Sequence, residues 1–185
     1  MTDLHRTSDP HAATRLLCRV RQTRDFRPDD VPVAALRDIL DVARWTGSAG
    51  NRQPWTFVVV SDPATKRSMA EAATNTPHIG IAPVVIVMAT EPRGVETDNF
   101  DEGRVAERIM IAAAAHGLAS GIGRASGDAQ GAIGRLLGVP DQLVVRTMVS
   151  VGYATEEGAR LKSPRGQARR PLESFIREGR FPGPS

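Results

Sequence analysis

Two stretches of the sequence carry side chains that could bind an anionic group. Arg21, Gln22 and Arg24 follow an apolar stretch with helical spacing, and Arg169 and Arg170 lie near the C-terminus. Neighbouring guanidinium groups can hold a phosphate through charge-assisted, bidentate hydrogen bonds. Because 22 of the 24 basic residues are arginines, a solvent-exposed basic surface is the competing interpretation of either stretch taken alone.

A polar segment precedes the first predicted strand. Ser48, Asn51 and Gln53 lie within six residues, just before an apolar run at 55–60. Their hydroxyl and amide groups both donate and accept hydrogen bonds, and Gly50 lets a flat ligand approach the backbone closely. A heterocycle with ring nitrogens and carbonyl oxygens needs such a set of partners. The alternative is a structural turn whose polar side chains cap backbone groups.

Glycines gather after the longest predicted helix. Gly117, Gly121 and Gly123 follow a helical pattern at 102–116, and we expect a loop whose backbone N–H groups can face a ligand. The segment is not a dinucleotide-binding fingerprint, because no predicted strand precedes it. A helix end followed by a turn explains these glycines equally well.

Several other kinds of site are excluded. The four histidines have no metal-ligand spacing, and there is neither a P-loop nor a nucleophile elbow. The one cysteine, Cys18, excludes an internal disulfide, and its apolar helical surroundings predict a buried position. With no apolar run near the roughly 18 residues of a membrane span and no signal-peptide core, we expect a cytoplasmic protein without a membrane partner.

Hydrophobic periodicity indicates which elements position these residues. It predicts an α+β fold, because the order α–α–β–α–β–α–α–β breaks a simple alternation of strands and helices. Strands are expected at 55–60, 83–89 and 143–151, and helices at 12–20, 32–43, 64–73, 102–116, 129–137 and 171–177.

A single domain with two terminal extensions is expected. The 185 residues are 41% apolar and 24% charged, which is typical of one globular domain. Residues 1–10 are predicted to be a disordered tip, 11–153 the domain and 154–185 a polar tail with no core of its own. Such a tail is typical of an arm that packs on another subunit.

An ordered set of motifs resembles the FMN-dependent nitroreductase family. The resemblance runs from about residue 15 to residue 177 and rests on Arg21-x-x-Arg24-x-Phe26-x-Pro28, Ser48-x-x-Asn51-x-Gln53-Pro54-Trp55, Phe100-Asp101-x-Gly103, Leu136-Leu137-Gly138-Val139-Pro140 and Gly152-Tyr153. It implies an α/β/α sandwich in which helices flank a small, mostly antiparallel sheet. It also implies a homodimer with two FMN molecules at the subunit interface and exchanged C-terminal arms.

The resemblance also implies roles for the polar residues. In that family's pattern, Arg21, Gln22 and Arg24 would hold the FMN phosphate and ribityl chain, and Arg169 or Arg170 would close on the phosphate. The second motif would contact the ribityl chain or the isoalloxazine edge through Ser48, Asn51 and Gln53, and the loop at Gly121 and Gly123 would present a backbone N–H to the flavin N5.

The implied activity is the reduction of an electron-poor small molecule. NAD(P)H would reduce FMN, and a nitroaromatic, quinone or similar substrate would then take the electrons in a ping-pong mechanism, which demands no catalytic side chain. The alternatives are a family branch with other flavin chemistry (flavin cleavage, dehalogenation or dehydrogenation) and a non-enzymatic flavin-binding protein. A nucleic-acid-binding module is disfavoured, because only eight aromatic residues are available to stack on bases.

The sequence departs from the family pattern in three places. Val20-Arg21-Gln22 stands where members often have Arg-Arg-Ser, and Gly47 stands where they often have proline. The segment between the strand ending at Ala89 and the helix from Glu102 is also short, which predicts a more open pocket.

Overall fold

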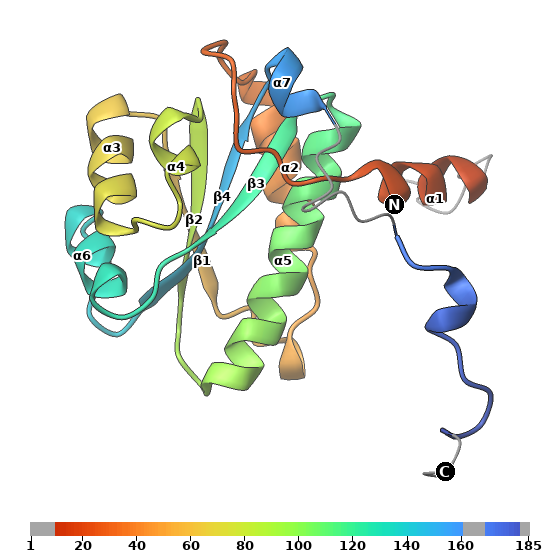
Figure 1. Ribbon diagram of the computed structural model, residues 1–185. Helices are drawn as coiled ribbons and strands as arrows, with labels where there is room; N and C mark the ends of the chain where they lie inside the picture. The colour runs from red at the N-terminus through yellow and green to blue at the C-terminus, as the bar shows by residue number, and fades with distance from the viewer. Residues whose placement is uncertain (1–9, 161–168, 182–185) are drawn as a thin grey trace, which may run out of the picture.

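A computed structural model describes residues 10–160 and 169–181. The predicted disordered tip therefore lies outside the described residues, except for Pro10, where the first helix begins. The elements are α1 (Pro10–Arg19), α2 (Val33–Arg44), η1 (Ala49–Asn51), β1 (Trp55–Val60), α3 (Pro63–Ala72), α4 (His78–Ile81), β2 (Val84–Thr90), α5 (Val95–Ala115), β3 (Ala119–Arg124), α6 (Asp128–Leu136), β4 (Val144–Gly152), α7 (Glu156–Ala159) and η3 (Leu172–Ser174) (Figure 1).

The strands of the described chain form one four-stranded antiparallel sheet in the order β1-β2-β4-β3. The central strands β2 and β4 are almost wholly buried. The sequence of β2 is a nearly continuous apolar run, which is expected of a strand covered on both faces, whereas β4 also buries Arg146, Thr147 and Ser150. The two edges of the sheet are β1 and β3.

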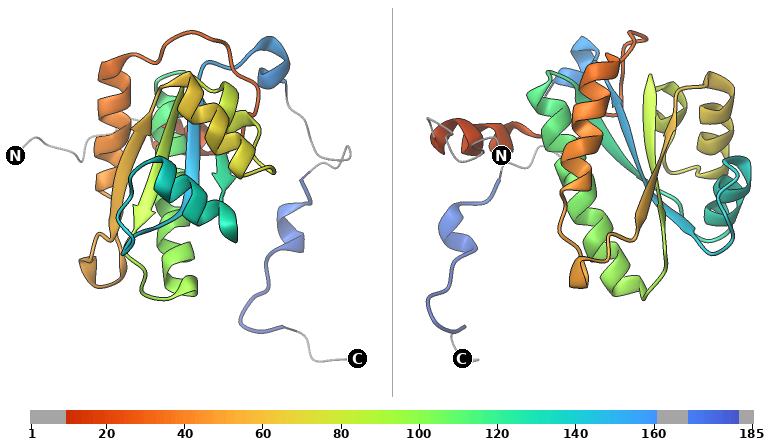
Figure 2. Two further views of the ribbon diagram at one scale, coloured as in Figure 1. Left: turned by 90° about the vertical axis from the view of Figure 1, so that its left-hand side faces the viewer. Right: turned by 180° about the vertical axis from the view of Figure 1, so that it is seen from behind.

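Helices cover both faces of the sheet (Figures 1 and 2). On one side α2 and α5 pack over Val84, Ile86 and Met88 of β2. On the other side α3, α4 and α6 pack over Val85 and Val87 of the same strand. Successive residues of one strand thus enter opposite cores, as the two-residue period of a strand requires. The predicted α+β sandwich is confirmed.

The glycine-rich loop predicted at 117–123 is wrong in part, because residues 119–124 form the strand β3. Gly117, with φ of 70°, makes the turn after α5, whereas Gly121 and Gly123 pair with β4. A Cβ on Gly121 would overlap the carbonyl oxygen of Thr23, and one on Gly123 would lie 3.1 Å from Ile79 Cδ1. These two glycines allow Thr23 and Ile79 to pack closely against β3. Glycine has a low propensity for strands, so the sequence did not indicate a strand here.

The position of Cys18 was also predicted wrongly. Cys18 is exposed, because α1 lies outside the layered body beside α5 and leaves most of its own surface uncovered. The helical spacing predicted the helix but not what packs on it. The long helix begins at Val95 rather than Glu102, and the predicted last helix is reduced to the single turn η3.

The described part of the C-terminal arm, residues 169–181, extends away from the layered body (Figures 1 and 2). It exposes large apolar side chains, namely Leu172, Phe175, Ile176 and Phe181. Within the described ranges, no helix is long and apolar enough to cross a membrane.

Replacing Gly121 should destabilise the fold. Gly121→Ala places a Cβ against a backbone oxygen that can move only with its chain, so we expect a loss of about 1–3 kcal/mol in the free energy of unfolding. Gly134→Ala is the matched control. It lies inside α6 with open space at its Cβ position, so it should gain up to about 1 kcal/mol. Chemical denaturation measures both, and a Gly121→Ala protein as stable as the wild type would contradict this packing.

Candidate functional site

The segment that follows α1 lies alongside the edge strand β3. Thr23 N donates to Ser120 O at 2.7 Å, and Gln22 forms a parallel bridge with Ser120. Ile122 N donates to Gln22 Oε1 at 3.4 Å. The structure therefore brings together Gln22 and the two glycines of β3, three of the predicted site residues that are far apart in the sequence.

A cavity of about 610 Å³ opens where this segment meets α1 and α5. Its lining consists of Leu17, Cys18, Val20, Arg21, Gln22, Glu107, Met110 and Arg169. Arg21 and Arg169 reach it from opposite ends of the chain, so one arginine of each basic stretch lines the same cavity. The sequence analysis did not predict the two α5 residues of the lining, Glu107 and Met110. The apolar spacing of a helix shows which face turns inward, but not which positions line a cavity.

The other predicted arginines lie elsewhere. Arg170 stacks its guanidinium over the ring of Phe175, 4.1 Å from the centroid, and does not line the cavity. Arg24 is also outside the lining, although it follows Gln22 closely. Arg21 Nη1 donates to the carbonyl oxygens of Cys18 and Val20, both at 2.7 Å, and so caps the end of α1.

His78 lies buried beneath the edge strand β3, next to Gly121. It is 2% exposed, and neither ring nitrogen has a hydrogen-bond partner within residues 10–160 and 169–181. A Cβ on Gly121 would stand 3.4 Å from its Cδ2. Burial, and second the positive charge of Arg24, lower the pKa of His78 below its ordinary 6.5. The described residues contain no group of His, Cys, Asp and Glu side chains that could hold a metal ion.

The predicted polar residues at 48–53 form a compact, strained loop. Ser48 Oγ accepts from Gln53 N at 2.8 Å, and Gln53 Nε2 donates to Asn51 O at 3.3 Å. Gly50, Asn51 and Gln53 have φ of 61°, 53° and 51°. Left-handed backbone is uncommon for residues with a Cβ and is concentrated at functional sites. The structure thus brings Ser48, Asn51 and Gln53 together.

This loop and the cavity lie on opposite sides of α5. Asp101 accepts from Ala49 N at 3.2 Å, and Arg108 Nη1 donates to Trp45 O at 3.1 Å. Met110, which lines the cavity, follows Asp101 by nine residues, and this spacing turns it about 180° around the helix. Within one chain, the loop therefore does not reach the cavity that contains Arg21.

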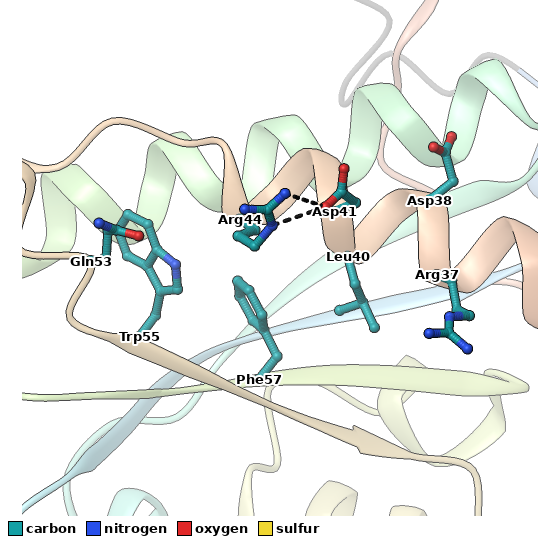
Figure 3. A pocket seen from close by; sticks show the side chains of 8 residues that line it. All are labelled: Arg37, Asp38, Leu40, Asp41, Arg44, Gln53, Trp55 and Phe57. Carbon is teal, nitrogen blue, oxygen red and sulfur yellow. Dashed lines mark hydrogen bonds and ion pairs between the residues drawn. The ribbon is translucent and has the colours of Figure 1, made fainter. Parts of the chain in front are cut away.

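A second cavity, of about 740 Å³, lies between α2 and the edge strand β1 (Figure 3). Leu40 and Phe57 project toward each other across it, and Gln53 and Trp55 stand at one end. Charged side chains of α2 form its rim, and Arg44 donates to Asp41 Oδ1 at 2.9 and 2.7 Å. The sequence did not predict this cavity, because α2 and β1 contribute its walls and no local pattern shows that these two elements lie side by side.

Comparison with known proteins decides the family. A profile described as "Nitroreductase family" matches residues 20–79 and 72–153. The chain belongs to the nitroreductase family. It is 33% identical over 175 residues to a protein named NADH dehydrogenase from Thermus thermophilus, across 75% of this chain and 84% of that protein.

Solved structures in this family share the fold. An FMN-dependent nitroreductase from Clostridium difficile superposes with a TM-score of 0.77 at 22% identity, and the superposition covers 90% of this chain and 98% of the Clostridium chain.

A shorter sequence similarity, 40% identity over 53 residues, links 29% of this chain to 24% of an iodotyrosine deiodinase from Haliscomenobacter hydrossis.

The stability of this family member should depend on His78 below neutral pH. The lowered pKa keeps the native imidazole neutral while the unfolded chain takes up a proton, so the free energy of unfolding falls as the pH drops through 6.5. The fall levels off below the native pKa and cannot exceed about 1.4 kcal/mol per pH unit for one proton.

Thermal unfolding of His78→Leu measures this contribution. The variant should lose less stability than the wild type between pH 8 and pH 5.5, because leucine does not titrate. At pH 8 the imidazole is neutral in both states, so stability there reports only the change in packing. An equal loss between the two pH values in both proteins would contradict the assignment.

Proposed function

We propose that this nitroreductase-family chain is an FMN-dependent oxidoreductase that takes electrons from NAD(P)H and passes them to an electron-poor small molecule such as a nitroaromatic or a quinone. The observation that carries the proposal is the convergence of Arg21, Gln22 and Arg169 on one cavity of about 610 Å³. Guanidinium groups from two distant segments suit a phosphate. The family membership and the FMN-dependent structural neighbour support the same cofactor.

The residues present fit FMN at both ends of such a ligand. Arg21 and Arg169 would bind its phosphate, and the Gln22 amide would bind the ribityl hydroxyls. Arg24, which lies outside the cavity lining, remains a further candidate for the phosphate because it follows Gln22 closely. Arg21 donates to the carbonyl oxygens of Cys18 and Val20, so binding a phosphate would exchange those bonds for charge-assisted ones.

The strand β3 supplies a donor for the ring system. Ile122 N meets Gln22 Oε1 at 3.4 Å, a long hydrogen bond that a ligand acceptor can replace. This N–H lies between Gly121 and Gly123 on the edge strand β3. We propose that it donates to the flavin N5 position.

The loop at 48–53 would complete the site from a second copy of the chain. It lies across α5 from the cavity of its own chain, whereas its exposed amide and hydroxyl groups suit a heterocycle. A homodimer would also cover the exposed apolar residues of α1 and of the arm. The free edge of β1, beside the cavity of about 740 Å³, is where we propose that the partner's arm packs.

The chain's own residues bind, orient and exclude water, whereas bound FMN supplies the exchange of hydride and electrons with donor and substrate. Donor and substrate would occupy the same space in turn, which gives ping-pong kinetics. A backbone N–H donor beside the ring would stabilise negative charge on the reduced cofactor, and the arginines would balance the charge of its phosphate. This scheme requires no acid or base, so we assign no catalytic side chain.

A second candidate function is reductive dehalogenation, favoured by the short similarity to an iodotyrosine deiodinase. Release of iodide from iodotyrosine by the reduced protein would establish it. Failure to release iodide, together with turnover of a nitroaromatic, would leave the first candidate.

Anaerobic mixing of the purified FMN-bound protein with NADH or NADPH tests the reductase activity. The flavin absorbance at about 450 nm should fall with at least one of the two donors and return on addition of a quinone or nitroaromatic. Absorbance that neither donor changes would contradict the NAD(P)H-dependent activity.

Removing Arg169 should weaken FMN binding. Loss of one charge-assisted hydrogen bond from Arg169→Ala should raise the Kd by about tenfold or more, measured by quenching of FMN fluorescence. Arg177→Ala is the matched control. It is also an arm arginine, but it does not line the cavity, and it donates to the backbone at Glu173 and Ile176. Equal affinities for Arg169→Ala and the control would contradict the phosphate-binding role.

A further inference from the structure

A buried carboxylate holds the strained loop at 48–53 from outside. Asp101 of α5 is 2% exposed, and its Oδ2 accepts from Ala49 N at 3.2 Å across 52 residues of sequence. The loop also has internal hydrogen bonds, from Gln53 N to Ser48 Oγ and from Asn51 N to Ser48 O. The internal bonds close the turn, whereas the Asp101 bond fixes the turn against the body of the protein.

The loop requires such a restraint. Asn51 and Gln53 are both left-handed and both exposed. Left-handed backbone is unfavourable for residues that carry a Cβ, and it persists only where surrounding contacts impose it. Exposed side chains supply little packing, so hydrogen bonds must impose this shape, and the bond from Asp101 adds to the internal bonds from the buried side of the loop.

Asp101 is itself carried on a firmly anchored stretch of α5. Asp98, one turn before Asp101, forms a buried ion pair with Arg146 of β4 at 3.3 Å. Glu102, the residue after Asp101, pairs with the same arginine at 3.2 Å. Thr147 Oγ1 also donates to Glu102 Oε2 at 2.6 Å. These contacts join the helix to the central strand, so the carboxylate of Asp101 is presented from a fixed position.

The departure at Gly47 belongs to the same arrangement. Arg104 pairs with Asp101 Oδ1 at 3.7 Å, and its Nη2 lies only 3.1 Å from where a Cβ on Gly47 would stand. A buried carboxylate is costly unless a charge or hydrogen bonds compensate it. Glycine at position 47 therefore leaves room for the arginine that balances Asp101.

We infer that Asp101 is a positioning residue that preorganises the loop at 48–53 for contact with the cofactor. This role rests on the proposed FMN function, and it assigns to a residue of α5 a task that the loop sequence alone does not reveal. Without the carboxylate, the loop would sample other conformations, and the affinity for FMN would fall in proportion to the population of the competent one.

The test compares Asp101→Ala, Asp101→Asn and the control Asp62→Ala. Asp62 also accepts a backbone hydrogen bond, from Thr65 N at 2.7 Å, but it caps α3 on the other face of the sheet. We expect Asp101→Ala to raise the Kd for FMN by about tenfold. Asp101→Asn, which keeps an acceptor oxygen, should recover much of the affinity. Asp62→Ala should lower the Tm but change the Kd less than about twofold.

Hydrogen exchange on the FMN-free protein gives a readout that does not depend on the cofactor. Amides of the peptide covering 48–53 should exchange about tenfold faster in Asp101→Ala and unchanged in Asp62→Ala. Unchanged exchange in folded Asp101→Ala, or an equal rise in Kd for Asp62→Ala, would overturn the inference. Wild-type protein that fails to bind FMN would instead contradict the proposed function, and hydrogen exchange would still decide the role of Asp101.

Discussion

The close approach of residues 22–24 to β3 determines where this chain can hold a ligand. Thr23 donates to Ser120, and the carbonyl oxygen of Thr23 occupies the space where Gly121 has no Cβ. This contact fixes the chain as it leaves α1, so that Arg21 and Gln22 line the cavity with α5. Arg169 reaches the same cavity from the arm. A side chain at position 121 would separate the segment from the strand and displace Arg21 and Gln22 with it.

Helix α5 then divides the polar residues into two groups. One side of the helix holds the loop at 48–53 through Asp101, and the opposite side lines the cavity through Met110. A site that uses both groups needs two copies of the chain, and the uncovered apolar surfaces of α1 and the arm are consistent with that requirement. The proposed dimer thus follows from the direction of side chains on one helix as much as from the family.

The sequence predicted the elements whose patterns are local. Apolar runs located β1, β2 and β4, and helical spacing located α2 and most of α5. The strand β3 was missed because its glycines serve a contact with Thr23, and a long-range contact leaves no local pattern. The same reason explains Cys18, whose exposure depends on what covers α1. Motifs indicated the polar residues of the proposed site, but not that α5 separates them or that Asp101 accepts a hydrogen bond from the loop.

FMN binding by this nitroreductase-family chain is tested most directly by the visible absorption spectrum of the purified protein. We predict a flavin absorption band at about 450 nm. After saturation with added FMN and removal of the excess, the protein should retain close to one FMN per chain. A colourless protein that retains no FMN under these conditions would contradict the account.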